Sequence, residues 1–256
     1  MASSLSRPIA IIAGAGPGTG AAIARRFAQT YPVVLLARSS TSLDPLVQGI
    51  NQNGGTALGL PTDVTNPDNM DSTMTQIRNH FGTDMTVAAA IFNVASKFSR
   101  TPFLDSGSEF LDSLEATARG SSAFAKAVIP FMLAEAEKSP ADQQQQQPQH
   151  PPTLIFTGAT ASLKGGSGLG SFAMSKFAVR ALAQSLAREF GPQGLHVAHA
   201  IIDGIIDTEQ TKDFNRDRPD SKIDPKWIAK SYWFLHTQPR TAFTQELDIR
   251  PYGETW

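Results

Sequence analysis

The chain has 256 residues, a formal net charge of −1 at neutral pH and no cysteine. That length suits one large α/β domain with a full core. The near-neutral charge provides no basic surface for nucleic acid or for a membrane, so neither partner is expected. The absence of cysteine excludes disulfides, thiolate catalysis and zinc–thiolate sites. Met1–Pro8 carries no long apolar segment, so we expect no signal peptide or membrane anchor and a cytoplasmic location.

A glycine-rich turn near the N-terminus joins a predicted strand to a predicted helix. Ile9–Ala13 is a short apolar run typical of a buried strand, and Ala21–Gln29 has helical spacing. Glycine allows positive φ and lets backbone N–H groups approach a phosphate, while the helix N-terminus adds a favourable partial charge. Strand, turn and helix together predict a dinucleotide site, whereas a plain tight turn would need only one or two glycines. The turn contains Gly14, Gly16, Gly18, Thr19 and Gly20.

Arg38 directly follows the second predicted strand, Val33–Ala37. In dinucleotide-binding folds an acidic residue about 20 residues past the glycines holds the ribose 2′-hydroxyl of NAD. A guanidinium at this place suits a 2′-phosphate, through bidentate charge-assisted hydrogen bonds. The sequence therefore favours NADP(H) over NAD(H), and the alternative is a solvent-exposed arginine at a strand end.

Asp63 and Val64 follow the third predicted strand, Thr56–Leu60. Asp63 at a strand end could accept a hydrogen bond from an adenine amino group while Val64 packs against the ring. An equally good interpretation is that Asp63 or Thr65 caps the next predicted helix, Pro67–Phe81. The residues alone leave both interpretations open.

The remaining segments continue the alternation of strands and helices. The other predicted strands are Met85–Phe92, Thr153–Thr157, Leu195–Ile202 and Phe243–Ile249. The other predicted helices are Leu43–Asn51, Ser108–Ala136, Ser171–Phe190 and Pro225–Thr237. This alternation predicts an α/β fold, a single-domain Rossmann-like doubly wound parallel sheet of about seven strands with helices on both faces, spanning residues 1–256.

Two segments stand apart from this pattern. Residues 138–152 contain five consecutive glutamines and several prolines, a composition that cannot bury a core. We expect a disordered surface insertion there, with a partner-binding segment as the alternative. The polar stretch Glu209–Ser221 follows the sixth strand, at the edge where ligands bind in such sheets, and could form a mobile lid.

The order of the elements and their motifs resemble the short-chain dehydrogenase/reductase family over essentially the whole chain. Gly14, Gly18 and Gly20 match the glycines of the family's Thr-Gly-x-x-x-Gly-x-Gly motif, with Ala13 in place of the threonine. Asp63-Val64 matches the family's adenine-contacting pair. The resemblance therefore implies that this pair contacts the adenine.

Two further segments carry the resemblance. Asn93-Val94-Ala95 resembles the Asn-Ala-Gly segment under the nicotinamide ribose. Ile202 to Thr208 resembles the Pro-Gly-x-x-x-Thr stretch beside the carboxamide, with Asp203 where proline is usual. Together with the glycine turn and Arg38, the resemblance implies an NADP(H) site formed by Gly14, Gly16, Gly18, Thr19, Gly20, Arg38, Asp63, Val64, Asn93, Lys176, Gly204, Ile206 and Thr208.

The catalytic motif departs from the family's pattern. The family uses Tyr-x-x-x-Lys, with a serine about thirteen residues before the tyrosine. Here Phe172 stands in the tyrosine's place and Ala159 in the serine's, while Lys176 is kept. Thr117 is the counterpart of the family's helix asparagine. The resemblance implies that Lys176 holds the nicotinamide ribose hydroxyls.

A phenylalanine has no titratable proton, and a missing general acid costs about 100- to 10,000-fold in rate. Another group must then supply the proton. Ser162, in the loop after the fifth strand, is the best single candidate, and we predict a catalytic set of Ser162, Phe172 and Lys176. The alternative for Ser162 is a loop hydroxyl bonded to backbone. Other candidate donors are Thr160, Asp203, Asp207, Ser96 and Lys97.

The sequence supports three hypotheses about function. The first is an NADP(H)-dependent oxidoreductase acting on a carbonyl, imine or activated double bond of a small organic substrate with a non-standard proton donor. The second is a non-redox isomerase, dehydratase or cyclase on the same scaffold, because Phe172 makes the pocket apolar, and the third is a non-catalytic nucleotide-binding protein. We expect no metal, since the five histidines are scattered, and a homodimer or homotetramer formed through the long helices and the last strand.

Overall fold

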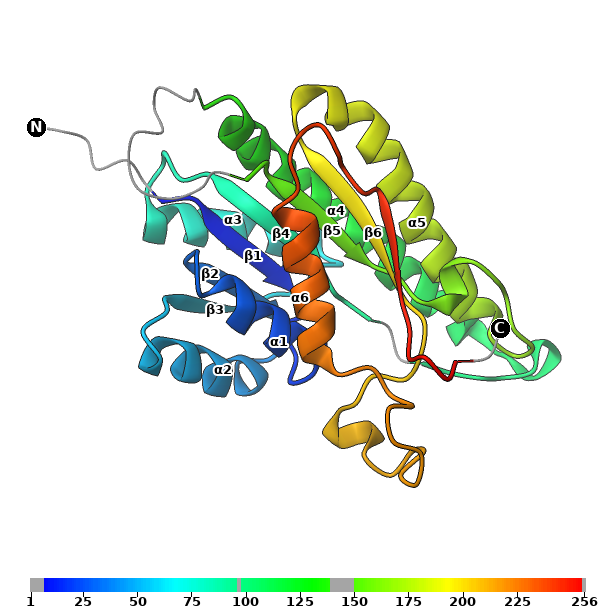
Figure 1. Ribbon diagram of the computed structural model, residues 1–256. Helices are drawn as coiled ribbons and strands as arrows, with labels where there is room; N and C mark the ends of the chain where they lie inside the picture. Colours follow the sequence, from blue (N-terminus) through cyan, green and yellow to red (C-terminus); the bar gives the residue numbers. More distant parts are fainter. Residues whose placement is uncertain (1–6, 96–97, 139–149, 255–256) are drawn as a thin grey trace, which may run out of the picture.

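A computed structural model of the protein describes residues 7–95, 98–138 and 150–254. Within these residues seven strands form one parallel sheet in the order β3-β2-β1-β4-β5-β6-β7 (Figure 1). The strands are β1 (Ile9–Ala13), β2 (Val33–Ala37), β3 (Ala57–Pro61), β4 (Val87–Phe92), β5 (Thr153–Thr157), β6 (His196–Ile202) and β7 (Glu246–Ile249). The order reverses direction between β1 and β4, which creates a crevice at the carboxyl ends of these two strands.

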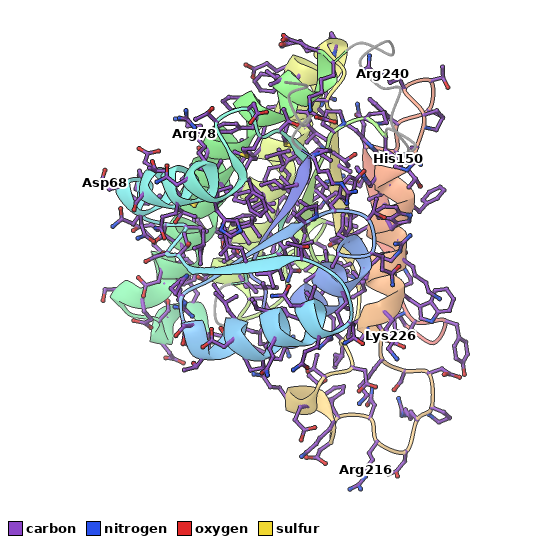
Figure 2. The ribbon with its side chains drawn as sticks, turned by 90° about the vertical axis from the view of Figure 1, so that its left-hand side faces the viewer. Asp68, Arg78, His150, Arg216, Lys226 and Arg240 are labelled. Carbon is purple, nitrogen blue, oxygen red and sulfur yellow. The ribbon has the colours of Figure 1, made fainter. Side chains whose placement is uncertain are left out.

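Helices cover both faces of the sheet, so the predicted doubly wound α/β architecture is confirmed. One face carries α1 (Thr19–Phe27), α2 (Ser40–Gln52) and α6 (Pro225–His236). The opposite face carries α3 (Pro67–Phe81), α4 (Asp112–Ala136) and α5 (Gly170–Phe190). Figure 2 shows this arrangement from the side, with Asp68 and Arg78 on α3 at one flank and Lys226 on α6 at the other.

The central strands are buried along their whole length. Every residue of β1, β4 and β6 is buried, because helices cover both faces of a parallel sheet. The two histidines of β6 are part of this interior and each finds a polar partner: His196 Nε2 lies 2.9 Å from the Thr244 carbonyl oxygen, and His199 Nδ1 lies 3.0 Å from the Glu246 carboxylate. Both histidines are thus explained by packing and hydrogen bonding.

Three element boundaries differ clearly from the predicted ones. The helix predicted from Leu43 begins earlier, at Ser40, because the Ser39 side chain caps its N-terminus. The predicted strand Phe243–Ile249 is shorter, since β7 begins at Glu246. The ring of Phe243 stacks on His196 at 4.3 Å, and the Thr244 N–H donates to the Gln238 side chain, so these residues are held by side chains instead of by strand pairing. The predicted helix from Ser108 begins with a 3₁₀ turn, Ser108–Leu111, before α4.

Some predictions concern residues outside the described part of the chain. Of the glutamine-rich insertion predicted over residues 138–152, residues 139–149 lie outside the described part, as do the candidate donors Ser96 and Lys97. At its C-terminal end, the ring of His150 packs against His236 at 5.3 Å, and the Pro152 carbonyl oxygen accepts the His196 N–H. Within the described residues, no helix is long and apolar enough to span a membrane. The described residues also contain no cluster of three or more His, Cys, Asp or Glu side chains that could hold a metal ion.

Candidate active site

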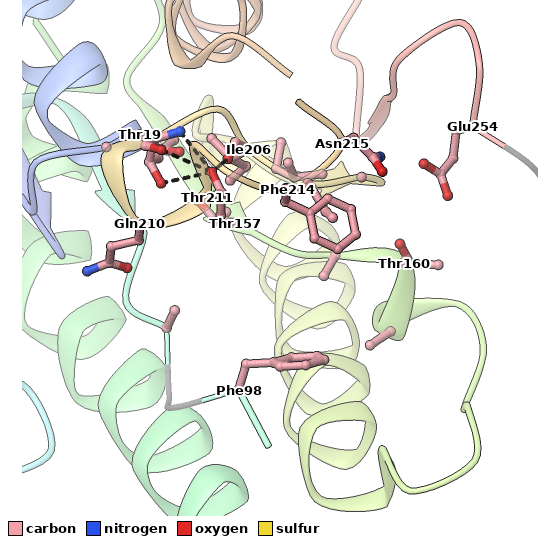
Figure 3. A pocket seen from close by; sticks show the side chains of 18 of the residues that line it. Thr19, Phe98, Thr157, Thr160, Ile206, Gln210, Thr211, Phe214, Asn215 and Glu254 are labelled. Carbon is pink, nitrogen blue, oxygen red and sulfur yellow. Dashed lines mark hydrogen bonds between the residues drawn. The ribbon is translucent and has the colours of Figure 1, made fainter. Parts of the chain in front are cut away.

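A cavity of about 1610 Å³ opens at the carboxyl ends of the central strands (Figure 3). Its wall comes from the turn after β1, from Asn93 after β4, from the loop after β5, from α5 and from the segment after β6. These are the loops that the crevice between β1 and β4 brings together in an open α/β sheet. The segment Glu209–Ser221 closes one side, and it extends away from the body of the molecule, with Arg216 at its far end (Figures 1 and 2).

The glycines of the turn after β1 differ in whether a side chain would fit at their positions. Gly14 has φ +82°, and a Cβ there would lie 2.5 Å from the Asn93 carbonyl oxygen. A Cβ on Gly20 would lie 2.2 Å from the carbonyl oxygen of Gly14, so α1 can pack against the turn only with glycine at this position. A Cβ on Gly16 would meet no atom within 4 Å. Gly14 and Gly20 are therefore required by the fold, whereas Gly16 leaves backbone open towards the cavity.

The N-terminus of α1 faces the same cavity and is suited to an anion. No side chain caps the helix at Gly18, and its first turn contains no acidic residue. Among the residues that the structure describes, none accepts a hydrogen bond from the backbone N–H of Gly16 or Gly18. Free N–H groups at a helix N-terminus form an anion site with positive partial charge. The turn thus fits the pyrophosphate of a dinucleotide.

Asn93 connects this turn to the middle of the sheet. Its side-chain amide donates to the Gly14 carbonyl oxygen at 3.1 Å and accepts from the Thr157 hydroxyl at 3.1 Å. Thr157 in turn lies 2.8 Å from the hydroxyl of Tyr232 on α6. Asn93 therefore fixes the glycine turn relative to β5.

Lys176 lies on α5, and its side chain lines the cavity. The residue is only 4% exposed, and its ammonium group donates to the Thr157 carbonyl oxygen at 3.1 Å. Burial lowers the pKa of the Lys176 ammonium to about 8, because a charged group loses hydration in the interior. The amine can consequently exist in both protonation states near neutral pH, and it lines the same cavity as the glycine turn.

Phe172 lies one helical turn before Lys176 and also lines the cavity. Its ring packs edge-on against Phe98 at 5.4 Å, and the Lys176 ammonium lies 5.8 Å from its centre. Ala159 and Phe214 extend the apolar surface of the cavity. Next to Lys176, the cavity wall is thus formed by aromatic rings and the methyl group of Ala159, none of which can titrate.

The structure separates Ser162 from the cavity. Ser162 is fully buried, its hydroxyl accepts the Ala159 N–H at 3.1 Å, and it is not among the residues that line the cavity. Its neighbour Thr160 does line the cavity, and the Thr160 hydroxyl donates to a carboxylate oxygen of Asp203. The spacing of a short 3₁₀ turn, Thr160–Ser162, turns the two hydroxyls in different directions.

Arg38 and Asp63 lie at the carboxyl ends of β2 and β3, at the same edge of the sheet but outside the cavity wall. Arg38 is exposed. Hydrogen bonds from the Thr65 hydroxyl and N–H, at 2.7 and 2.9 Å, lower the pKa of the exposed Asp63 carboxyl, with a smaller contribution from the charge of Arg38. Asp63 and Thr65 thus form a local turn, and the residue that caps α3 is Asn66. Val64 is 6% exposed and belongs to the core.

The segment after β6 supplies the other wall of the cavity. Gly204 has φ +151°, and a Cβ there would lie 2.8 Å from Pro251. Ile206 pairs with Ile223 in a parallel bridge, and both Ile206 and Thr208 line the cavity. Asp207 does not line it; its carboxylate lies 2.6 Å from the Lys222 ammonium, which closes the base of the 209–221 segment.

Several residues of the cavity escaped the sequence reasoning. Phe98, Phe214 and Glu254 lie in irregular segments, far apart in the sequence, and side chains of all three reach the cavity (Figure 3). Phe214 had one signal, because it is the only aromatic residue in the polar stretch Glu209–Ser221. Phe98 and Glu254 match no motif, and only the folded chain places them.

Comparison with known proteins agrees with this architecture. A family model described as short chain dehydrogenase matches residues 8–219. A short-chain dehydrogenase from Rhodopseudomonas palustris is 32% identical, with a TM-score of 0.71 over 96% of this chain and 99% of that one. An uncharacterised oxidoreductase of Staphylococcus aureus (strain N315) is 28% identical over 96% of this chain and 98% of its own length.

A metagenomic short-chain oxidoreductase in complex with NADP shares the fold at 21% identity, with a TM-score of 0.76 over 97% of this chain and 99% of that one. The family model covers well over half of the chain, and the sheet order, the glycine turn and the relatives agree with it. The chain therefore belongs to the short-chain dehydrogenase family.

Proposed function

We propose that the protein is an NADP(H)-dependent oxidoreductase that acts on a carbonyl, imine or activated double bond, or on the corresponding reduced compound, in a small or medium-sized organic molecule. The observation that carries this proposal is the single cavity shared by the uncapped N-terminus of α1, the open backbone at Gly16 and the buried Lys176. When bound, a nicotinamide cofactor supplies the hydride chemistry. The chain's own residues hold it: the turn receives the pyrophosphate, and Lys176 donates to the ribose hydroxyls.

Arg38 supports a preference for NADP(H). Its guanidinium follows β2, next to the glycine turn of β1, where a 2′-phosphate of the adenosine ribose would receive bidentate hydrogen bonds. The relative of metagenomic origin is in complex with NADP, and an alcohol dehydrogenase from Thermococcus sibiricus, 19% identical with a TM-score of 0.79 over 97% of this chain and 98% of that one, is complexed with 5-hydroxy-NADP. Asp63 and Thr208 complete the adenine and carboxamide ends of the proposed site, whereas the side chain of Val64 is buried in the core and supports the adenine end from behind.

We also propose that the proton does not move through residue 172. Phe172 occupies the position of the family's tyrosine and Ala159 that of its serine, so neither hydroxyl is available. The buried Ser162 hydroxyl, our first candidate for the replacement, accepts the Ala159 N–H and does not line the cavity, which argues against it as the proton donor. Thr160 does line the cavity, but its hydroxyl donates to Asp203, so it can serve the substrate only as an acceptor. Lys176 keeps its place beside the site and orients the cofactor.

The first test is nucleotide binding. We expect micromolar binding of NADPH and much weaker binding of NADH, followed by nicotinamide fluorescence or calorimetry. Arg38→Ala should weaken NADPH binding about 10- to 100-fold and leave NADH binding unchanged, because it removes charge-assisted hydrogen bonds that only the 2′-phosphate makes. Arg25→Ala is the matched control, since Arg25 is also exposed and lies on α1 away from the cavity.

The other outcomes point to different functions. If NADH binds more tightly than NADPH, the proposed role of Arg38 is wrong, but the proposed oxidoreductase function still stands. Binding of neither nucleotide would favour a non-redox enzyme, to which the apolar wall of Phe98 and Phe172 is suited.

We further propose that the chain acts as one domain and assembles as a homodimer or homotetramer. Met174 and Phe177 on the outer face of α5 are each 43% exposed and support such an assembly. Sedimentation that shows only monomer would contradict it.

A further inference from the structure

Thr160 and Asp203 form a polar pair beside the cavity that the proposed cofactor site does not explain. They follow the neighbouring strands β5 and β6, and the Thr160 hydroxyl donates to one carboxylate oxygen of Asp203. The Asp203 residue is 5% exposed, and its other carboxylate oxygen lies 3.2 Å from the Arg250 guanidinium. A buried carboxylate needs such a cationic partner, so Arg250 holds Asp203 in place behind Thr160.

The direction of this hydrogen bond determines what Thr160 offers to a ligand. A hydroxyl has one proton and two acceptor lone pairs, whereas a carboxylate only accepts. The hydroxyl proton of Thr160 is therefore used in the hydrogen bond to Asp203. The Thr160 oxygen can then only accept a hydrogen bond from a group in the cavity. Within the part of the chain that the structure describes, no group donates to this oxygen. A ligand that displaces water from this oxygen can satisfy the vacant acceptor only with a donor group.

Three phenylalanine rings line the cavity that Thr160 also lines, and they give an apolar group of a ligand a place to bind. These rings belong to Phe98, Phe172 and Phe214. Apolar walls accommodate an aryl or branched alkyl group, and a few polar groups orient the ligand within them. Binding is therefore weakened when a ligand places an acceptor atom, which cannot donate, against the Thr160 oxygen.

We propose that Thr160 is a specificity-determining residue that selects the hydroxyl form of the substrate, an alcohol carrying an aryl or branched alkyl group. An alcohol donates its O–H to Thr160 Oγ1. The carbonyl oxygen of the corresponding ketone can only accept, so it forms no hydrogen bond with Thr160 Oγ1. Asp203 is the positioning residue, because it holds the Thr160 proton. This inference rests on the proposed oxidoreductase function and names the substrate class for it.

The test compares 1-phenylethanol with acetophenone, an alcohol and a ketone of nearly the same size. Binding to the full-length protein without added nucleotide is measured by ligand-observed NMR, so that no turnover occurs. We expect wild type to bind 1-phenylethanol about three- to tenfold more tightly, the typical value of one hydrogen bond. Thr160→Val, which keeps the shape and removes the hydroxyl, should abolish the preference, and Thr160→Ser should retain it.

Asp203→Asn tests the positioning role with a readout that a merely structural residue would not give. The amide oxygen should turn to Arg250 and the amide N–H₂ to Thr160, since Arg250 can only donate. The Thr160 proton is then released towards the cavity, and the preference should reverse in favour of acetophenone. A thermal melt confirms that each variant is folded.

Three results would overturn the inference: no preference or no binding in wild type, a preference that survives in Thr160→Val, or an unchanged preference in folded Asp203→Asn. NADPH titration of the same samples keeps the two proposals apart. Wild type that fails to bind NADPH contradicts the proposed function, whereas normal NADPH binding without the alcohol preference contradicts only the role of Thr160.

Discussion

The two sides of the cavity are shaped by different parts of the chain. On the β1 side the decisive contacts are between backbone atoms: Gly14 against Asn93, and Gly20 against Gly14. On the β5–β6 side the surface is made by side chains, namely Phe172, Lys176 and Thr160, whose hydroxyl is held by the buried Asp203. The first side therefore depends on the absence of side chains and the second on their identity.

This difference explains how the residue four positions before Lys176 can vary while the fold stays intact. Phe172 is half-buried, lines the cavity and packs edge-on against the exposed ring of Phe98, so a change there leaves the core untouched. A change at Gly20 meets a backbone carbonyl that cannot move without shifting β1 or α1. We thus expect substitutions on the β1 side to alter stability first and those on the β5–β6 side to alter chemistry first.

Gly20→Ala should have the largest effect on the free energy of unfolding. A variant as stable as wild type would contradict the contrast between the two sides of the cavity. Its Cβ would lie 2.2 Å from the Gly14 carbonyl oxygen, and overpacking of this kind costs about 3 kcal/mol of unfolding free energy. Urea denaturation measures the loss. Gly16→Ala is the matched control, because it meets no atom within 4 Å; it should keep wild-type stability and weaken NADPH binding.

Phe172→Tyr should change chemistry without changing stability. A phenol one turn before the Lys176 ammonium could act as a general acid, and we expect reduction of acetophenone by NADPH to rise about 100-fold. Phe98→Tyr adds the same phenol to the other ring of the pair and should produce no such gain. Equal rates in the two variants would show that position 172 has no special place in the site.

Lys176→Met should change stability less than Gly20→Ala does, and in the opposite direction. A buried lysine whose pKa is lowered from 10.5 to about 8 costs a few kcal/mol near neutral pH, partly offset by its hydrogen bond to Thr157. We expect the variant to gain about 1 kcal/mol at pH 7 while its NADPH binding weakens about tenfold.

The pH dependence of this gain has a definite sign. Between pH 8 and 10.5 the folded wild type binds fewer protons at Lys176 than the unfolded chain, so its stability rises with pH in this window. The advantage of Lys176→Met over wild type should shrink as the pH rises from 8 towards 10.5. Thermal melts of both proteins at pH 7, 8.5 and 10 measure this, and a constant difference would contradict the burial of a titrating amine.

Much of the fold could be predicted because its signals are local. Apolar runs such as Ile9–Ala13 and Met85–Phe92 indicated buried strands, and the glycine turn with the following helix indicated the site at the end of the first strand. Strand ends were less certain where side chains compete with pairing. Phe243 has strand propensity, but its ring stacks on His196 and the strand begins three residues later.

The sequence by itself determined the alternation of strands and helices, the glycine positions that the turn requires, and the phenylalanine one helical turn before Lys176. Only the tertiary structure decided which loop hydroxyl reaches the cavity. Ser162 and Thr160 are two residues apart and equally polar, but a 3₁₀ turn directs Ser162 to the backbone and Thr160 to Asp203. The physical reason is that side-chain direction in a short turn depends on the neighbouring strand, here β6, which lies about forty residues further along the chain.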